Sequence, residues 1–273
     1  MEIKTAIEAF AALGHPGRLA VLRLLARRAP GGVRPTEMAE ALEIKHSTLS
    51  VYLGALSRAG LVLSERDGKS IYYRLDLAGM SGLIEVLVAD CCRGRPELCT
   101  PIAERFTNSR SKGHPIRVLF VSRGNSARSI FAEALLRVHG GDQFEVHSAG
   151  TAPKDALTPQ ARDLLKKLDY DLTNLVPKPV SGFQGGKAIV MDFVFTVCDR
   201  AANEDQQQWR GNPMIAHWSV PDPVSMQDER QRANGYLMAY QTLERRIAGL
   251  ADLPIHEMSR LDLQHALDAL GET

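Results

Sequence analysis

The stretch that decides the fold of the larger part of the chain is Val118-Leu-Phe-Val-Ser122-Arg-Gly-Asn-Ser-Ala-Arg128-Ser129. Its apolar start predicts a buried strand, the small residues after it predict a tight loop, and the apolar periodicity that follows predicts a helix. The residues expected on the buried face of that helix are Ile130, Ala134, Leu135 and Val138. Such a loop presents backbone N–H groups and the positive end of the helix dipole, and Arg128 can add a bidentate guanidinium. The stretch therefore predicts a cradle for an oxyanion.

This stretch resembles the catalytic loop of low-molecular-weight tyrosine phosphatases and of the arsenate reductases built on the same fold. In that family a cysteine, five residues and an arginine surround phosphate or arsenate, and Gly124-Asn125 and Arg128-Ser129 match the family's pattern. The resemblance implies that phosphate, sulfate or arsenate binds the loop formed by Ser122, Arg123, Gly124, Asn125, Ser126, Ala127, Arg128 and Ser129. Ser122 stands where the family has its cysteine nucleophile. Arg123 stands where a small residue is usual, and it either adds a second positive charge or obstructs the loop.

Residues 115–273 alternate strands and helices, which predicts a parallel sheet covered on both faces. The expected strands are 116–121, 144–148, 193–197 and 214–218, and the expected helices are 127–139, 159–168 and a segment after Gln227. In such a sheet ligands bind at the carboxyl ends of the strands, which is where the loop at Ser122 would lie. The expected fold is a three-layer α/β domain with a four-stranded parallel sheet, like that of the low-molecular-weight phosphatases.

More of residues 115–273 resembles the arsenate reductase branch of that family. The matching motifs are Ser148-Ala-Gly-Thr151, Val197-Cys-Asp-Arg-Ala-Ala-Asn-Glu204, Trp209-Arg-Gly-Asn-Pro213, His217-Trp218 and Pro221-Asp222-Pro223. The resemblance implies that Asp222 is the general acid of the phosphatases. It also places Cys198 at one of the two redox cysteines of the thioredoxin-coupled reductases. Asp205, Gln206 and Gln207 occupy the region where the other redox cysteine is expected.

The serine at position 122 bears on whether the loop catalyses a reaction. N–H groups at a helix N-terminus lower the pKa of a cysteine into the physiological range, whereas a serine hydroxyl is far more basic and no neighbouring histidine is evident to activate it. Serine also cannot exchange electrons as sulfur does. We expect a domain that no longer reduces arsenate, with Ser122 at the nucleophile position, Arg128 as the oxyanion ligand and Asp222 as the general acid. The alternative is a bifunctional regulator and arsenate reductase or phosphatase, if Ser122 replaces a native cysteine.

The first hundred residues predict a different kind of domain. Helices are expected over residues 3–13 and 16–27, then a short helix capped by Thr36, and a further helix over residues 46–56. Residues 61–63 and 71–75 alternate like strands around Arg66-Asp-Gly-Lys69, whose Asp-Gly pair favours a hairpin turn. A short helix, a tight turn and a helix with a polar outer face suit reading of the DNA major groove.

The residues expected to contact DNA are Lys45, His46, Ser47, Thr48, Ser50, Tyr52, Arg66 and Lys69. The alternative is a small α/β module whose polar residues are only solvated. The order of elements, with Ala12-Leu13-Gly14-His15-Pro16-Gly17-Arg18-Leu19 and Ser47-Thr48-Leu49-Ser50, resembles ArsR-type winged-helix repressors over residues 1–99. That resemblance implies a homodimer that leaves its operator when a metal or metalloid ion binds. The family's best-known sensor cysteines are absent from the corresponding stretch, Val33 to Leu42.

Three cysteines at the end of this domain are the candidate ion ligands. Met80, Leu83, Ile84, Leu87 and Val88 recur at helical spacing, and Cys91 continues their stripe. Cys92 adjoins Cys91, and Cys99 follows after a segment with Gly94 and Pro96 that allows the chain to fold back. Three thiolates suit trivalent arsenic or antimony, whereas zinc would more usually require a fourth ligand. The alternative is that the cysteines are buried or idle thiols.

Length and composition allow two domains, with residues 100–114 as the linker. The formal net charge of +1 neither favours nor excludes nucleic acid. The sequence lacks an apolar run of about 18 residues and a leading apolar segment, so we expect a soluble, cytoplasmic protein without a membrane partner or an organic cofactor. The favoured hypothesis is an arsenite-responsive repressor of an arsenic-resistance operon. A bifunctional enzyme and a purely structural second domain remain the alternatives.

Overall fold

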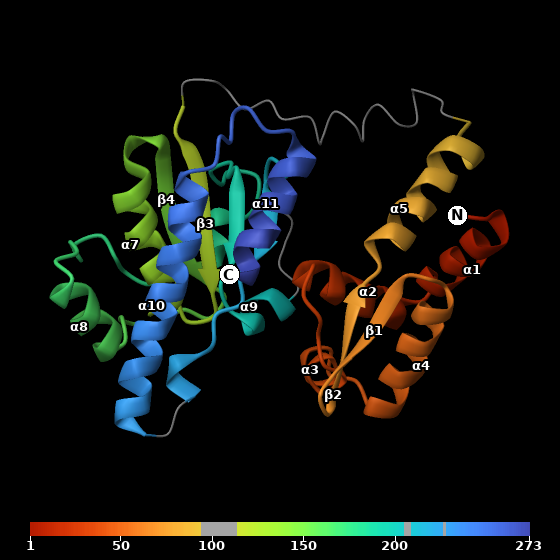
Figure 1. The fold of residues 1–273 in the computed structure, drawn as a ribbon, viewed down its shortest axis with the longest axis horizontal. Coiled ribbons are helices and arrows are strands. Elements are labelled where there is room, and N and C mark those ends of the chain that lie inside the picture. Colours follow the sequence, from red (N-terminus) through yellow and green to blue (C-terminus); the bar gives the residue numbers. More distant parts are fainter. Residues whose placement is uncertain (94–113, 205–208, 226–227) are drawn as a thin grey trace. The chain divides into compact units, whose positions relative to one another are not determined.

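The computed structural model describes residues 1–93, 114–204, 209–225 and 228–273, and the structural statements below refer to these residues. The chain divides into two compact units, an N-terminal unit that ends before the first strand of the sheet domain and a C-terminal unit that begins there. Each is described by itself (Figure 1). Cys99 and almost all of the expected linker lie outside the described residues. Among the described helices, none has the length and apolarity required to span a bilayer.

The N-terminal unit is a helix-turn-helix followed by a β-hairpin. Its elements are α1 (Ile3–Leu13), α2 (Pro16–Arg28), α3 (Pro35–Ala41), α4 (His46–Arg58), β1 (Val62–Asp67), β2 (Ser70–Leu75), α5 (Leu77–Glu85) and the π-helical turn η1 (Val86–Cys91). The strands β1 and β2 are antiparallel, and the turn between them contains Gly68 at a φ of +57°. Leu49, Leu53 and Leu56 of α4 are buried in the core of the unit, as their spacing predicted.

One local expectation for the N-terminal unit is wrong. The short helix α3 begins at Pro35, and its N-cap residue is Arg34 without a side-chain cap, so Thr36 does not cap it. Proline is preorganised for the first helical turn and therefore moves the helix start forward. The apolar stripe expected on the last helix has both buried and exposed members in the single chain. Leu83 is buried, whereas Ile84 and Leu87 are exposed.

The C-terminal unit is a three-layer α/β domain with a four-stranded parallel sheet in the order β4-β3-β5-β6. The strands are β3 (Ile116–Ser122), β4 (Phe144–Gly150), β5 (Phe193–Thr196) and β6 (Met214–His217). The helices are α7 (Arg128–Gly140), α8 (Pro159–Lys167), α9 (Asp199–Asn203), α10 (Glu229–Ala251) and α11 (Arg260–Glu272), with short 3₁₀ turns η2 (Gly141–Gln143), η3 (Val180–Phe183) and η4 (Pro223–Ser225). The expected fold class is confirmed.

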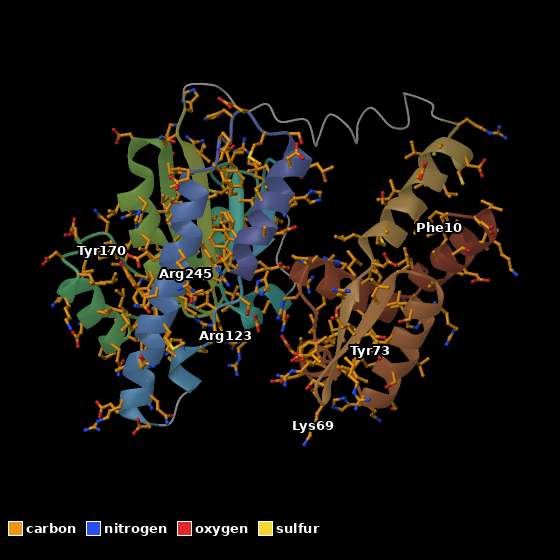
Figure 2. The ribbon with its side chains drawn as sticks, viewed as in Figure 1. Phe10, Lys69, Tyr73, Arg123, Tyr170 and Arg245 are labelled. Atoms are coloured by element: carbon orange, nitrogen blue, oxygen red, sulfur yellow. The ribbon has the colours of Figure 1, made fainter. Side chains whose placement is uncertain are left out.

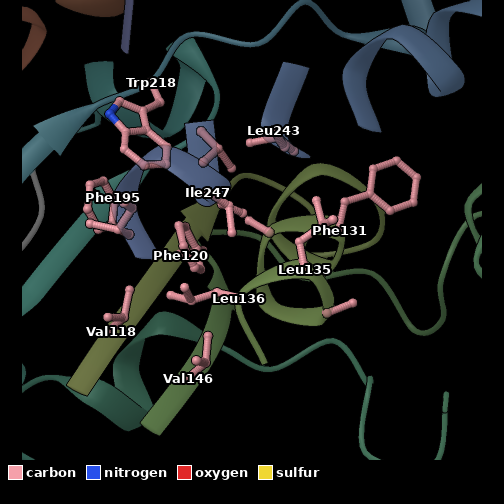
Figure 3. Packing of buried hydrophobic residues seen from close by; sticks show 14 of the residues in the cluster. Val118, Phe120, Phe131, Leu135, Leu136, Val146, Phe195, Trp218, Leu243 and Ile247 are labelled. Atoms are coloured by element: carbon pink, nitrogen blue, oxygen red, sulfur yellow. The ribbon is translucent and has the colours of Figure 1, made fainter. Parts of the chain in front are cut away.

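Both faces of this sheet are covered, because side chains of a strand alternate between its faces. Val118 and Phe120 of β3 belong to the larger core, in which α7, α8, α10 and α11 pack on the sheet. Leu119 and Val121 belong to a smaller core on the opposite face, together with residues of α9. Figure 3 shows the larger core, where Phe120, Phe195 and Trp218 contact one another beside Leu243 and Ile247 of α10.

The expected helices of this unit are present at the expected residues, but three details differ. α7 is buried along most of its length, yet Val138 is 65% exposed and does not belong to its buried face. The five-residue helix α9 was not expected, and the segment after Gln227 contains two helices, α10 and α11.

Candidate functional site

The loop formed by residues 122–129 connects the carboxyl end of β3 with the start of α7. A neighbouring segment, residues 151–158, holds its backbone in place. The N–H groups of Thr151, Ala152 and Lys154 donate to the carbonyl oxygens of Ser122, Arg123 and Gly124 at 3.1, 2.8 and 2.9 Å. Because these carbonyl oxygens are occupied, their negative ends are kept away from an anion in the loop.

Asn125 fixes the shape of the loop from inside. Its φ is +44°, a left-handed conformation that asparagine tolerates better than most residues. The side chain is fully buried. Its Nδ2 donates to the Oγ atoms of Ser129 and Ser148 at 2.9 and 2.7 Å, and its Oδ1 accepts from the backbone N–H of Lys178 at 2.7 Å. The amide therefore ties the loop to α7, to β4 and to the segment around Lys178.

Behind this asparagine lies a buried carboxylate that sequence reasoning missed. Glu133 of α7 is fully buried, and the Oγ of Ser148 donates to its Oε2 at 2.5 Å. Arg137 pairs with the other oxygen, and the Nζ of Lys178 lies 3.5 Å from Oε2. Two cations thus compensate a charge that would be costly to bury alone. The only sequence signal was a glutamate inside an otherwise apolar helical run.

Ser122 is the last residue of β3 and the first of the loop, and it is almost completely buried. The backbone N–H of Asn125 donates to its Oγ at 3.1 Å, and its Oγ lies 2.8 Å from the Oγ of Ser129. Neither group is a base that could take up the serine proton. These two groups could therefore stabilise negative charge on a nucleophile at position 122. Among the contacts of the described residues, Ser122 has no base that could activate it.

Arg128 and Asp222, which the motifs assign to the same site, lie in contact with each other. The Nη2 of Arg128 lies 3.1 Å from the Oδ2 of Asp222, and its Nη1 donates to the carbonyl oxygen of Val220 at 2.9 Å. The N–H of Val224 donates to the other oxygen of Asp222 at 3.2 Å. Asp222 is partly exposed, whereas Arg128 is mostly buried. The arginine of the loop is thus oriented by the segment that carries the acid.

Cys198 is close to the loop but buried. Its Sγ accepts the N–H of Arg123 at 3.2 Å and the N–H of Ala201, at the start of α9, at 3.4 Å. Arg123 itself is exposed. Residues 205–207, where the resemblance places a second redox position, lie outside the described residues.

The second helix of the helix-turn-helix exposes most of the expected DNA-contacting residues. Lys45, His46, Ser47 and Ser50 are exposed and Thr48 is half-buried. Ser50 donates its hydroxyl hydrogen to the carbonyl oxygen of His46 at 3.0 Å, so it can offer only an acceptor to a base.

Tyr52 does not point outward as expected. Its ring centroid lies 5.0 Å from that of His15, and a Cβ at Gly17 would lie 2.5 Å from its Cε2. Tyr52 follows Leu49 by three residues and therefore shares the inward face of α4. Val51, 66% exposed, lies on the outer face instead. Helical spacing from Ser47 would have identified it.

The basic residues of the hairpin remain exposed at its turn. The Nε of Arg66 donates to the carbonyl oxygen of Gly68 at 3.3 Å, so this side chain lies across the turn. Lys69 lies at the tip with its side chain directed away from the unit (Figure 2). The hairpin thus presents two cations, three positions apart in sequence, on either side of Asp67 and Gly68.

The candidate ion ligands are only partly described. Cys91 is exposed at the end of η1, Cys92 is half-buried beside it, and Cys99 lies outside the described residues. Within the part of the chain that the structure describes, no group of three or more Cys, His, Asp or Glu side chains could hold a metal ion. The three-cysteine site therefore stays a prediction.

Together, the fold and the loop define a protein that joins a helix-turn-helix unit with a hairpin wing to an α/β unit with an oxyanion loop. A family model described as low molecular weight phosphotyrosine protein phosphatase matches residues 117–262, and one described as helix-turn-helix domain matches residues 13–65. The chain belongs to the low molecular weight phosphotyrosine protein phosphatase family and carries a helix-turn-helix domain in addition.

Similar proteins fall into the same two groups. The Biofilm growth-associated repressor of Agrobacterium fabrum is 40% identical over 80 residues, which cover 29% of this chain and 66% of that protein, just under two thirds. The uncharacterized HTH-type transcriptional regulator YbzH of Bacillus subtilis is 36% identical over 30% of this chain and 93% of its own length. The arsenate reductase of Oceanobacillus iheyensis is 30% identical over 40% of this chain and 76% of its length.

Solved structures with similarity include the arsenate reductase of Archaeoglobus fulgidus, at 21% identity and a TM-score of 0.41 over 50% of this chain and 99% of that one. The thioredoxin-dependent arsenate reductase of Corynebacterium glutamicum has 18% identity and a TM-score of 0.39 over 79% of this chain and 92% of that one.

Proposed function

We propose that this protein is an arsenite-responsive transcriptional repressor of an arsenic-resistance operon, whose C-terminal unit binds a tetrahedral oxyanion without converting it. The observation that carries the proposal is a complete anion-binding loop with serine at the nucleophile position and a helix-turn-helix unit in the same chain. The similarity to a repressor and to arsenate reductases supports both halves of the proposal.

Binding of operator DNA is assigned to α4 and the hairpin. Lys45, His46, Ser47 and Ser50 supply donors and acceptors on the exposed face of α4, and Val51 supplies an apolar contact for a thymine methyl group. Arg66 and Lys69 would contact phosphates beside the groove. This division gives α4 the sequence-specific contacts and the hairpin a salt-dependent share of the affinity.

A homodimer is assigned to the exposed apolar face of α1 and α5. Ile3, Ile7 and Phe10 recur at spacings of four and three residues and are exposed, as are Ile84 and Leu87. A Cβ at Gly82 of α5 would lie 3.2 Å from the Cβ of Met1, so the start of the chain just before α1 lies against α5. Exposed apolar side chains on both helices favour an interaction surface, and a second copy would bury it symmetrically.

Sedimentation of the full chain tests this dimer. Wild type is expected to sediment as a dimer at micromolar concentration, and Ile7→Glu is expected to sediment as a monomer because it places a charge in the interface. Val138→Glu, which changes an equally exposed apolar residue on α7, is the matched control and should remain dimeric. A monomeric wild type would contradict the assignment.

Release of DNA is assigned to arsenite bound by Cys91, Cys92 and Cys99. Adjacent cysteines at the end of the helix next to the proposed dimer face, with one of them exposed, can take up a soft ion. Such an ion would stabilise one arrangement of the two subunits over another. Its coupling to DNA affinity is expected to lie in the usual allosteric range of about 5-fold to 150-fold.

The decisive experiment measures DNA binding separately with arsenite and with arsenate, using a duplex that the full chain has selected from a random library. Arsenite is expected to release the wild-type protein, and the Cys91→Ser, Cys92→Ser double variant is expected to stay bound. Cys198→Ser, which changes a buried cysteine of the other unit, is the control and should still respond. Release of the double variant by arsenite would show that the mechanism is wrong, and release by arsenate alone would make the C-terminal unit the sensor.

A second candidate function is catalysis by the loop. The observation that favours it is the pair of hydrogen-bonding groups around position 122, the N–H of Asn125 and the hydroxyl of Ser129, which would stabilise a thiolate as well as a hydroxyl. On this hypothesis the chain would be a phosphatase or arsenate reductase once a cysteine stands at position 122.

A further inference from the structure

Helix α10 contains a buried arginine, Arg246, outside the oxyanion loop. Arg246 is only 6% exposed, and its Nη1 donates to the carbonyl oxygen of Ser219 at 3.0 Å. Its Nε is buried without a hydrogen-bond partner. Across the described residues, no carboxylate forms a salt bridge with it, and its charged neighbour is another cation, Arg245. Burial lowers the pKa of Arg246, and the charge of Arg245 lowers it further.

This arrangement is unfavourable for the fold considered alone. A buried cation without a carboxylate loses hydration that one hydrogen bond to a carbonyl oxygen does not replace. An apolar side chain of similar length would fill the same volume without that cost. The hydrogen bond that Arg246 makes is with Ser219, so the role of Arg246 is to be sought in the segment that begins at Ser219.

Ser219 is the first residue of the segment that carries the acid, residues 219–222, which we call the acid segment. Its hydroxyl donates to Asp199 at 2.7 Å, and its carbonyl oxygen accepts from Arg246. The carbonyl oxygen of Val220 and the carboxylate of Asp222 then contact Arg128 of the oxyanion loop. Two guanidinium groups, one from α10 and one from the loop, thus hold consecutive parts of the same short segment.

We propose that Arg246 is a positioning residue of the oxyanion site: it holds the acid segment in place so that Arg128 stays oriented at the mouth of the loop. The proposal rests on the proposed oxyanion binding and adds a residue outside the loop to it. An arginine that is already ordered loses less side-chain freedom when an anion binds. Without Arg246 the acid segment would be held at its start by fewer contacts, and Arg128 would have to be ordered by the ligand.

The test compares the full chain with Arg246→Met and Arg246→Lys, using inorganic phosphate as the probe. Arg246→Met is expected to weaken phosphate binding about threefold to tenfold in calorimetry, the cost of ordering one long side chain. Hydrogen exchange of a peptide covering residues 218–225 should become faster, while peptides from β3 and β4 should be unchanged. The urea midpoint is expected to change little, because the lost hydrogen bond is offset by removal of an uncompensated charge. Arg246→Lys keeps a donor and should recover part of the affinity.

Arg245→Gln is the matched control, since it removes the same charge from the adjacent, exposed position of α10 (Figure 2). Unchanged affinity and exchange in Arg246→Met would overturn the proposal, and so would a loss of affinity with faster exchange throughout the sheet. If wild type does not bind phosphate, oxyanion binding itself is disproved, and exchange of residues 218–225 alone decides whether Arg246 holds the acid segment. If Arg246→Met does not fold, Arg246→Lys decides: it should bind phosphate more weakly than wild type, with faster exchange confined to residues 218–225, and wild-type values in both measurements would overturn the proposal.

Discussion

Replacing Ser122 by cysteine is expected to produce turnover of an aryl phosphate such as p-nitrophenyl phosphate, from a wild type that has none. The loop already supplies an N–H and a hydroxyl next to position 122, which would stabilise a thiolate. That thiolate would attack phosphorus and form an S–P bond, while the leaving phenolate takes the proton of Asp222. Water would then release phosphate and regenerate the thiol. Steady-state release of p-nitrophenol measures the effect.

The same background tests the role of Asp222. In the Ser122→Cys protein, Asp222→Asn is expected to lower kcat by about 10²-fold to 10⁴-fold, the usual contribution of a general acid. Ser122→Ala, which has neither thiol nor hydroxyl, is the control and should remain inactive. A folded Ser122→Cys protein that binds phosphate but shows no turnover would argue strongly against catalysis as the function of this unit.

Arg128→Lys is expected to weaken phosphate binding by about tenfold to a hundredfold. A hydrogen bond between charged groups contributes about 1.5–3 kcal/mol, and lysine keeps the charge but cannot form the planar, two-pronged contact of a guanidinium. A lysine at position 128 would also lose one of the two contacts that Arg128 makes with Val220 and Asp222. Its side chain would therefore no longer be held in the orientation of the arginine. Calorimetry with phosphate on the full chain provides the measurement.

Arg162→Gln, at an exposed position of α8, is the control for a general loss of positive charge and should bind phosphate like wild type. The thermal midpoint of each variant separates weaker binding from unfolding. If Arg128→Lys binds phosphate with unchanged affinity, the anion does not occupy the loop of residues 122–129.

Local patterns along the chain predicted most of the fold. The four strands of the sheet begin where expected, and their ends differ by one or two residues. The apolar run before Ser122 and the small residues after it predicted both the strand and the loop, because buried strands and tight turns have distinct side-chain requirements. Two motifs nearly a hundred residues apart assigned Arg128 and Asp222 to one site, and the structure adds a contact between them that the sequence did not predict.

Long-range packing explains what was missed. Tyr52 was assigned to the outer face of α4, yet it packs on His15 of a different element. Val138 continued an apolar stripe but has nothing packed over it. Glu133 and Arg246 look like ordinary surface residues of helices until the structure shows them buried. For Val138, Glu133 and Arg246 the environment depends on which distant segments come together, and side-chain spacing within one helix does not contain that information. The inward position of Tyr52, by contrast, follows from its three-residue spacing from Leu49.

The sequence alone determined the division into a helix-turn-helix part and an oxyanion-loop part, the order of the strands and of most helices, and the presence of serine in place of the nucleophile. These follow from residue types and their spacing within one element or one loop. Only the tertiary structure decided how the loop is held: Asn125 by Lys178 and Ser148, and Arg128 by an acid segment that Arg246 anchors in turn. The physical reason is that buried polar groups must find partners, and those partners come from elements far apart in the chain.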